Sequence, residues 1–304
     1  MRYYDDLVRK ARGRAVFEAQ RKRVATGGQG GGEGRRVRGS CHGQVELEQC
    51  ARGKIEPMPD IQLPPRTKWG TFPDVVIYAA ESAVKQHPAY QAAKSGDDGA
   101  ATDLVLDNFS LEKTQELDAL VGNRTPTLVS AHAVERGGVN AIPEVFAMHL
   151  GEVLGWPVDG GIVQANVVGH TSADGFWRMA RQAEFQGMVT PGCEYVLVDD
   201  FVGMGGTLAN LKGYIESNGG HVLAAVALTG KPHSARLAPT AERLRELRTK
   251  HGKELENWWI GRFAHSFDAL TESEARYLAR TEAADTIRNR IAEAEQKGDR
   301  PEIS

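Results

Sequence analysis

The chain has 304 residues, of which 41% are hydrophobic and 25% are charged, with a formal net charge of −3 and a pI near 6.3. This composition is typical of a soluble globular protein, and the weak net charge excludes an overall field that would attract nucleic acid or an acidic membrane. Three cysteines cannot form a disulfide framework, and neither a signal-peptide pattern nor a run of ~18 apolar residues occurs, so we expect a cytoplasmic protein in a reducing compartment.

The first 56 residues are predicted to form a basic helix and a glycine-rich linker. Apolar and basic residues alternate in a helix-like way at the start, and the run TGGQGGGEG then breaks all periodicity. The arginines within residues 35–38 add to the positive charge. Nucleic acid is therefore a candidate partner through residues 1–55 alone, but a solvated basic tail is the commoner explanation and the one that we favour.

A cysteine–histidine cluster raises the question of zinc. The segment CHGQVELEQC places Cys41, His42 and Cys50 close together in sequence. It lacks the paired CxxC or HxxxH spacing of a tetrahedral site. We therefore predict no zinc site in this segment.

Residues 57–125 are predicted to form a mainly helical extension. The proline-rich stretch from Pro57 to Pro73 favours extended backbone, and residues 74–94 and 110–121 have helical patterns. Ser110 is expected to act as the N-cap of the second helix.

Short β-rich segments alternate with helical segments from residue 126 to residue 232. Strands are predicted in PTLVSA, PVDGGIV, EYVLV and HVLAAVALT, and helices over residues 140–155 and 207–218. Such alternation is typical of a parallel sheet with crossover helices. We therefore predict an α/β core with flanking helices over residues 126–232.

Residues 233–304 are predicted to form a helical C-terminal extension. A segment rich in Arg, Glu and Leu comes first, and Thr271 with Glu274 then supplies the capping box of a further helix. The adjacent Trp258 and Trp259 are able to stack on a base. Paired tryptophans in a helical region are more often core and interface residues, and we favour that role.

The stretch VLVDDFVGMGGT, residues 196–207, carries most of the chemical information. Residues 195–198 are expected to form a buried strand, so Asp199 and Asp200 emerge at its carboxyl end, where open α/β sheets bind ligands. The glycines that follow let backbone N–H groups point inward, and Thr207 adds a hydroxyl at the start of a helix, which together favour an anion. A sugar phosphate satisfies both halves, because its phosphate suits the turn and its hydroxyls suit the carboxylates.

This stretch resembles the ribose-phosphate motif of the type I phosphoribosyltransferases. The resemblance implies that the chain binds 5-phosphoribosyl diphosphate, and that Asp199 and Asp200 act in catalysis by orienting the ribose hydroxyls near the cation that develops at C1. It implies Mg²⁺ as a cofactor that is held mainly by substrate oxygens, with the same two aspartates as candidate ligands. The residues implied to hold the phosphate are Gly203, Met204, Gly205, Gly206 and Thr207.

A second segment is similar to the diphosphate loop of this family. In TPTLVSAHAVERGGVN, a predicted strand runs into a loop that precedes a helix. Arg136 would neutralise the diphosphate while the neighbouring glycines let backbone amides approach it, although a tight turn with a solvent arginine is the alternative. The substrate-binding residues implied here are Glu135, Arg136, Gly137 and Gly138.

Residues 165–187 form a long segment without a clear place in the sheet. In the family, the corresponding segment is a flexible lid over the reactive centre, which makes His170, Arg178 and Arg181 candidate substrate contacts. These basic residues weakly resemble the competence-associated branch of the family. A surface helix that carries Arg178 and Arg181 explains them equally well.

The motif also departs from the family's pattern. Gly203 stands where the 6-oxopurine branch has an acid that exchanges a proton with the base, so hypoxanthine and guanine are disfavoured acceptors. Met204 replaces a common threonine and so removes one phosphate-binding hydroxyl. The run DDF is similar to the corresponding run of xanthine phosphoribosyltransferases and of purine repressors. Phe201 either packs near a base or, as we favour, lies in the core. Specificity is expected from a hood drawn from residues 57–125, 230–290 or both.

Three functions fit these observations. We favour an enzyme that transfers a phosphoribosyl group from 5-phosphoribosyl diphosphate to a nitrogenous base or another acceptor, with release of diphosphate. The alternatives are a regulator that senses the same ligand through a non-catalytic core coupled to the basic N-terminus, and an interaction protein on a degenerate core. The resemblance covers about residues 120–232; it leaves the acceptor open and allows a homodimer.

Overall fold

The computed structural model describes residues 66–131, 134–135, 138–166 and 174–298. All of them belong to one compact unit that begins at Pro64. Several sequence expectations fall outside the described residues: those for residues 1–65, including the cysteine–histidine cluster, and those for Arg136, Gly137 and His170.

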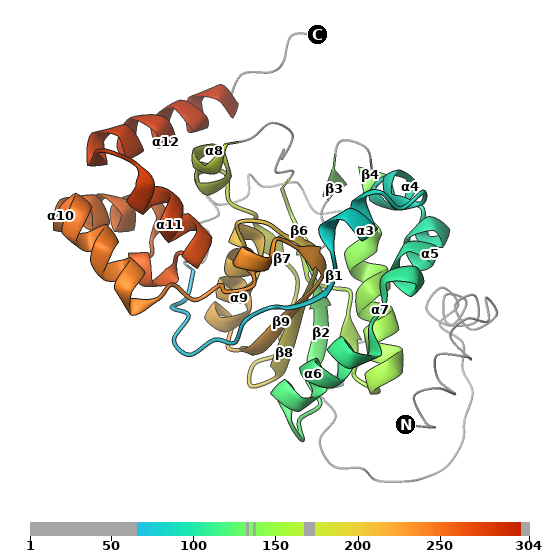
Figure 1. The fold of residues 1–304 in the computed structure, drawn as a ribbon. Coiled ribbons are helices and arrows are strands. Elements are labelled where there is room, and N and C mark those ends of the chain that lie inside the picture. Colours follow the sequence, from blue (N-terminus) through green and yellow to red (C-terminus); the bar gives the residue numbers. More distant parts are fainter. Residues whose placement is uncertain (1–65, 132–133, 136–137, 167–173, 299–304) are drawn as a thin grey trace, which may run out of the picture. The chain divides into compact units, whose positions relative to one another are not determined.

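Five parallel strands form the central sheet of this unit, in the spatial order β1-β9-β8-β2-β5 (Figure 1). These strands are β1 (Val76–Ala79), β2 (Thr127–Ser130), β5 (Val158–Asp159), β8 (Glu194–Val202) and β9 (His221–Gly230). The middle strand, β8, is buried along nearly its whole length, as expected of a parallel strand that is covered on both faces. The predicted α/β fold with a parallel sheet and flanking helices is therefore confirmed.

The edge strand β1 corrects the sequence prediction. β1 pairs with β9, with Val76 opposite Val226, so a single helix over residues 74–94 is wrong at its start. The run VIYA is rich in β-branched and aromatic side chains and is buried at alternate positions, which suits a strand. Two short helices follow, α3 (Glu81–Lys85) and α4 (Tyr90–Lys94). The segment ahead of the predicted core thus contributes a strand to the sheet.

Helices cover both faces of the sheet (Figure 1). One face carries α5 (Asp98–Asn108), α6 (Leu111–Val121) and α7 (Ile142–Leu154), and the other carries α9 (Gly206–Ser217). Helix α7 leads from β2 outward to β5, whereas α9 leads from β8 in the opposite direction to β9. The direction of winding therefore changes between β2 and β8, and in such sheets ligands bind at the carboxyl ends of the strands at this point.

No helix among the described residues is long and apolar enough to cross a membrane. Cys193 is buried in the hydrophobic cluster on the α9 face.

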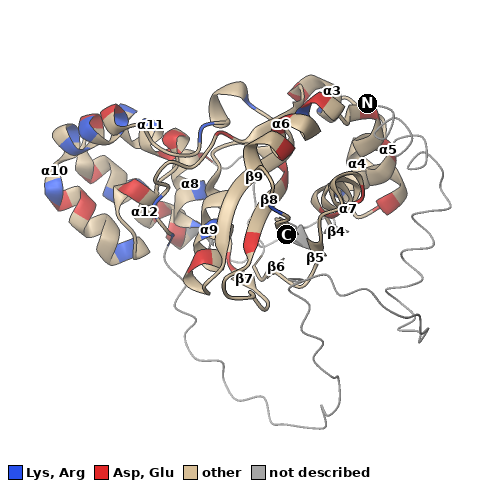
Figure 2. Cartoon of the chain, turned by 90° about the horizontal axis from the view of Figure 1, so that it is seen from below, with Lys and Arg blue, Asp and Glu red and all other residues tan. Residues whose placement is uncertain are grey.

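The C-terminal extension is helical, as predicted, and encloses a hydrophobic cluster of its own. Its helices are α10 (Ala241–Phe263), α11 (Glu272–Arg280) and α12 (Ala284–Gly298), joined by α8 (Gly175–Ala180). Basic and acidic residues are interspersed along α10 (Figure 2). The capping box of Thr271 and Glu274 is present at the start of α11. Trp259 is buried in the cluster and Trp258 packs against it, so both are core residues, as we favoured.

The remaining elements are short. They are the hairpin of β3 (Val134–Glu135) and β4 (Gly138–Val139), the pair of β6 (Val163–Gln164) and β7 (Phe185–Gln186), and the 3-10 turns η1 (Pro232–Ser234) and η2 (Phe267–Ala269). The expected cap of α6 is confirmed, because the backbone N–H of Lys113 donates to Ser110 Oγ at 3.2 Å.

Candidate ligand-binding site

The two aspartates of the motif lie at the carboxyl end of the central strand, beside the point where the winding changes. β8 includes both residues and ends at Val202, and α9 begins at Gly206 after a short turn. Both side chains are buried, with Asp199 7% and Asp200 9% exposed. The two carboxyl groups lie close enough to influence each other's ionisation.

The charges of these two acids are only partly offset within the fold. The backbone N–H of Asp200 donates to Asp199 Oδ1 at 2.8 Å, and Lys94 Nζ on α4 donates to Asp200 Oδ2 at 3.1 Å. Burial, and after it the neighbouring charge of Asp200, raises the pKa of Asp199 well above its ordinary value. Adjacent buried acids with a perturbed pKa are typical of functional sites.

Two glycines of the turn lie in close contact with the C-terminal part of the chain. Gly205 has a φ of +81°, and a Cβ at this position would lie 2.5 Å from Leu237 Cδ2. A Cβ on Gly206 would lie 3.1 Å from Glu274 Oε1. Packing against α11 and the segment before it therefore gives these glycines a structural role, which the sequence analysis had assigned to the approach of a phosphate.

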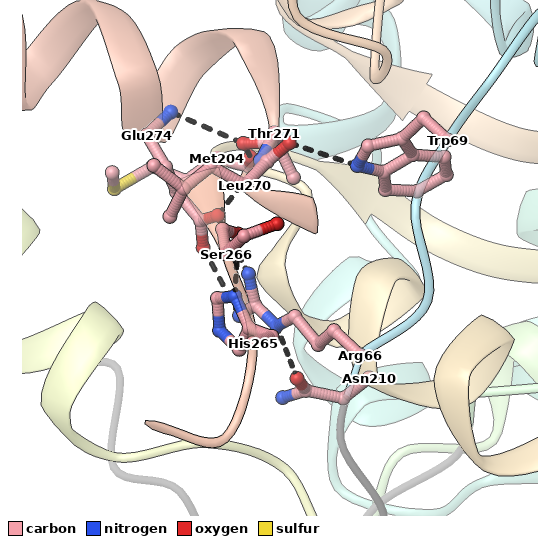
Figure 3. A network of polar contacts seen from close by, with 9 residues as sticks. All are labelled: Arg66, Trp69, Met204, Asn210, His265, Ser266, Leu270, Thr271 and Glu274. Atoms are coloured by element: carbon pink, nitrogen blue, oxygen red, sulfur yellow. Dashed lines mark hydrogen bonds and ion pairs between the residues drawn. The ribbon is translucent and has the colours of Figure 1, made fainter. Parts of the chain in front are cut away.

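A buried polar network joins α11 to the start of α9 (Figure 3). Arg66 donates to Glu274 Oε2 at 2.7 Å and to Glu274 Oε1 at 3.1 Å, and its Nε donates to Asn210 Oδ1 at 2.5 Å. Thr271 Oγ1 donates to the backbone oxygen of Met204 at 2.6 Å. The side chain of Met204 packs against the C-terminal cluster, so this departure from the family's threonine has a structural explanation.

A cavity of about 290 Å³ adjoins the turn at Gly203 and Met204. It is lined by residues at or just beyond the carboxyl ends of β1, β8 and β9 and by residues of α8 and α11. The acids Asp199 and Asp200 and the hydroxyl of Thr207 do not line it. Its lysine and arginine side chains are Lys85, Arg178, Lys231, Arg276 and Arg280.

The two arginines of the expected lid lie in different surroundings. Arg178 lines the cavity, and its Nη1 lies 3.5 Å from the position that a Cβ on Gly203 would take. Arg181 does not line the cavity: its guanidinium lies 4.7 Å from the ring centroid of Trp177, and it donates to the backbone oxygen of Glu295 at 3.4 Å. Arg178 lies on α8 and Arg181 directly follows this helix, and both residues are half-buried.

Glu135, Gly138 and Phe201 are further residues that the sequence singled out. Glu135 and Gly138 lie in the β3–β4 hairpin that follows β2, the strand next to β8. Phe201 is half-buried and lines the cavity, with Lys85 Nζ 4.1 Å from its ring centroid, so our preference for a core role was wrong.

Five basic residues at this edge of the sheet were not predicted from the sequence: Lys85, Lys94, Lys231, Arg276 and Arg280. Each is an ordinary basic residue in its own segment, and only the fold brings it close to the turn. A signal existed for Lys231, because it follows the predicted strand HVLAAVALT at the end where such sheets bind ligands.

No family model matches the chain. The chain is 40% identical over 229 residues to the protein TraN of Escherichia coli, which covers 75% of this chain and 51% of TraN. It is 38% identical over 151 residues to an uncharacterized protein of Haemophilus influenzae, which covers 49% of this chain and 34% of that protein. The chain thus spans about half or less of the length of these curated relatives.

Among solved structures, the chain is similar to adenine phosphoribosyltransferases, which belong to the class that the motif resembles. The adenine phosphoribosyltransferase of Leishmania donovani is 16% identical with a TM-score of 0.28, over 62% of this chain and 84% of that enzyme. A score and an identity this low support no conclusion about activity or ligand. The case for a ligand site therefore depends on the residues at the carboxyl edge of the sheet.

Proposed function

We propose that the chain binds 5-phosphoribosyl diphosphate at the turn between β8 and α9 and transfers its phosphoribosyl group to an acceptor. The observation that carries this proposal is the pair of buried acids, Asp199 and Asp200, at the carboxyl end of the central strand. Ribose hydroxyls would donate hydrogen bonds to these carboxylates, which the fold satisfies only in part. The turn and the N-terminal end of α9, a helix of 12 residues, would supply backbone N–H groups to a phosphate.

The proposed reaction exchanges one bond at ribose C1 for another. The bond from C1 to the diphosphate oxygen breaks, and the diphosphate leaves with the electron pair. A bond forms from C1 to the acceptor, which loses a proton. Positive charge develops on the ribose ring between these events, and Asp199 and Asp200 would stabilise it while they orient the hydroxyls. The reaction needs no covalent nucleophile from the protein.

The residues present fit a magnesium ion that is held mainly by the substrate. The described residues contain no group of three or more His, Cys, Asp or Glu that is arranged to hold a metal. Asp199 and Asp200 offer carboxylate oxygens, but Lys94 already contacts Asp200 at 3.1 Å. Mg²⁺ on the phosphate oxygens would neutralise the charge of the leaving diphosphate, and the aspartates would supply a minor part of its coordination.

Titration calorimetry with 5-phosphoribosyl diphosphate and Mg²⁺ tests the binding step. We expect the wild type to bind and Asp199→Asn/Asp200→Asn to bind about tenfold more weakly or worse, because hydrogen bonds to two charged acceptors are lost. Asp103→Asn is the matched control, since Asp103 is exposed on α5. Equal affinities of the double variant and the control would contradict the proposed site.

A diphosphate-release assay with a panel of nitrogenous bases and other acceptors tests the transfer step. Release that depends on Mg²⁺ and on an acceptor is the expected result. Tight binding without release across the panel would contradict catalysis and favour the regulator that senses the same ligand.

A further inference from the structure

The cavity beside the turn carries positive charge that the fold does not neutralise. Five lysine and arginine side chains line it, against one acid, Glu81. Glu81 is paired with Lys85 at 2.6 Å. Within the described part of the chain, Lys231, Arg276 and Arg280 form no ion pair with a carboxylate. Like charges that gather in this way repel one another, so a bound anion would relieve the cluster.

The basic side chains come from separate elements that meet at the carboxyl edge of the sheet. Lys85 lies on α3 after β1, and Lys231 follows β9 directly. Arg276 and Arg280 lie four residues apart on α11, so they share one face of that helix. Arg178 approaches from α8. No regularity of a single helix explains this convergence, which depends on the tertiary fold.

Hydroxyl groups and aromatic rings complete the lining of the cavity. Ser234 and Ser273 are buried, with their hydroxyl oxygens 3.5 Å apart, and Arg276 donates to Ser273 Oγ at 3.3 Å. Phe201 and Tyr277 contribute aromatic surface. Guanidinium groups and hydroxyls are the donors that suit phosphate oxygens, and aromatic surface suits a base.

We infer that this cavity binds a nucleoside phosphate, as a ligand separate from the sugar phosphate at the turn. The volume of about 290 Å³ suits a small molecule rather than a macromolecule. Since Asp199, Asp200 and Thr207 do not line the cavity, its ligand would lie next to the sugar phosphate rather than in its place. The separation of the two ligands rests on the proposed function, whereas the anion site itself does not.

Titration calorimetry with ATP and with AMP tests this inference. We expect ATP to bind the wild type more tightly than AMP, and Arg276→Gln/Arg280→Gln to weaken ATP binding at least tenfold. Arg245→Gln is the matched control, because Arg245 is exposed on α10 outside the cavity. Circular dichroism and thermal unfolding check that each variant is folded. Absence of ATP binding by the wild type, equal affinities of the two variants, or tighter binding of a single-stranded oligonucleotide than of ATP would overturn the inference.

The same proteins separate this inference from the proposed function. Asp199→Asn/Asp200→Asn should bind 5-phosphoribosyl diphosphate weakly and ATP as the wild type does. Arg276→Gln/Arg280→Gln should bind ATP weakly and 5-phosphoribosyl diphosphate as the wild type does. If the wild type binds ATP but not 5-phosphoribosyl diphosphate, the proposed function fails alone. If the arginine variant loses both ligands, the cavity is part of a single sugar-phosphate site, and a separate nucleotide site is excluded.

Discussion

Two buried clusters of charge meet the turn between β8 and α9, and they are built in opposite ways. Arg66 and Glu274 have opposite signs and pair through two hydrogen bonds, with side chains that are 3% and 2% exposed. Asp199 and Asp200 have the same sign and stand next to each other, and burial and this proximity raise the pKa of Asp199. In the first cluster, the opposite charges of Arg66 and Glu274 neutralise each other and connect α11 to α9. In the second cluster, the two acids are only partly neutralised within the fold.

This difference separates the residues that hold the turn in place from those that are available to a ligand. Gly205 belongs to the first group, because Leu237 packs against it and its φ is +81°. Gly203 belongs to the second group, because it lines the cavity and has no such backbone constraint.

Glu274→Ala is expected to have the largest effect on stability. The substitution leaves the Arg66 guanidinium buried without its carboxylate and removes the acceptor of the Thr271 N–H, which donates to Glu274 Oε2 at 2.9 Å. Removing one partner of a buried pair lowers the free energy of unfolding by about 3–5 kcal/mol. Urea denaturation followed by circular dichroism measures this loss. Arg66→Met/Glu274→Leu removes both charges and should recover most of it; a double variant as unstable as the single one would show that packing dominates instead.

Gly205→Ala should lower the free energy of unfolding by about 2 kcal/mol. Its backbone lies in the left-handed region, and the new Cβ would lie 2.5 Å from a side chain of the buried Leu237. Gly203→Ala should cost less than about 1 kcal/mol, because its closest contact is the ring of Phe201 at 3.2 Å. The same urea experiment compares the two. Similar losses from both substitutions would break the distinction between structural and ligand-facing glycines.

The fold and the site were predictable from the sequence to different extents. The β8–α9 unit was predictable, because an apolar run, two acids and several glycines are contiguous and leave little choice of structure. β1 was missed because the four residues VIYA run directly into helices and have their partner, β9, far along the chain. The role of Gly206 was also beyond the sequence, since close packing by Glu274 and close approach by a phosphate both require glycine. The basic cavity was missed because its residues come together only in the tertiary structure.

Asp199→Asn is expected to have the smallest effect on stability. Unlike the substitutions above, it should raise the free energy of unfolding. The folded protein holds the pKa of Asp199 well above its ordinary value, whereas the unfolded chain ionises this residue near pH ~3.9. The wild type therefore loses stability as the pH rises from about 4 through the folded pKa, because the unfolded state releases its proton first. Asparagine does not titrate, and its Oδ1 is still able to accept from the N–H of Asp200. The variant should thus have a higher free energy of unfolding than the wild type at pH 8, with little difference below pH ~4.

Urea denaturation at pH 4 and at pH 8 measures this change, and Asp103→Asn should differ little from the wild type at either pH. The same Asp199→Asn protein is expected to bind 5-phosphoribosyl diphosphate more weakly, so that stability rises while affinity falls. Opposite changes of this kind mark a residue that is retained for a ligand at the expense of the fold. An Asp199→Asn protein that is less stable than the wild type at pH 8 would make Asp199 a structural charge like Glu274, and the contrast between the two clusters would no longer hold.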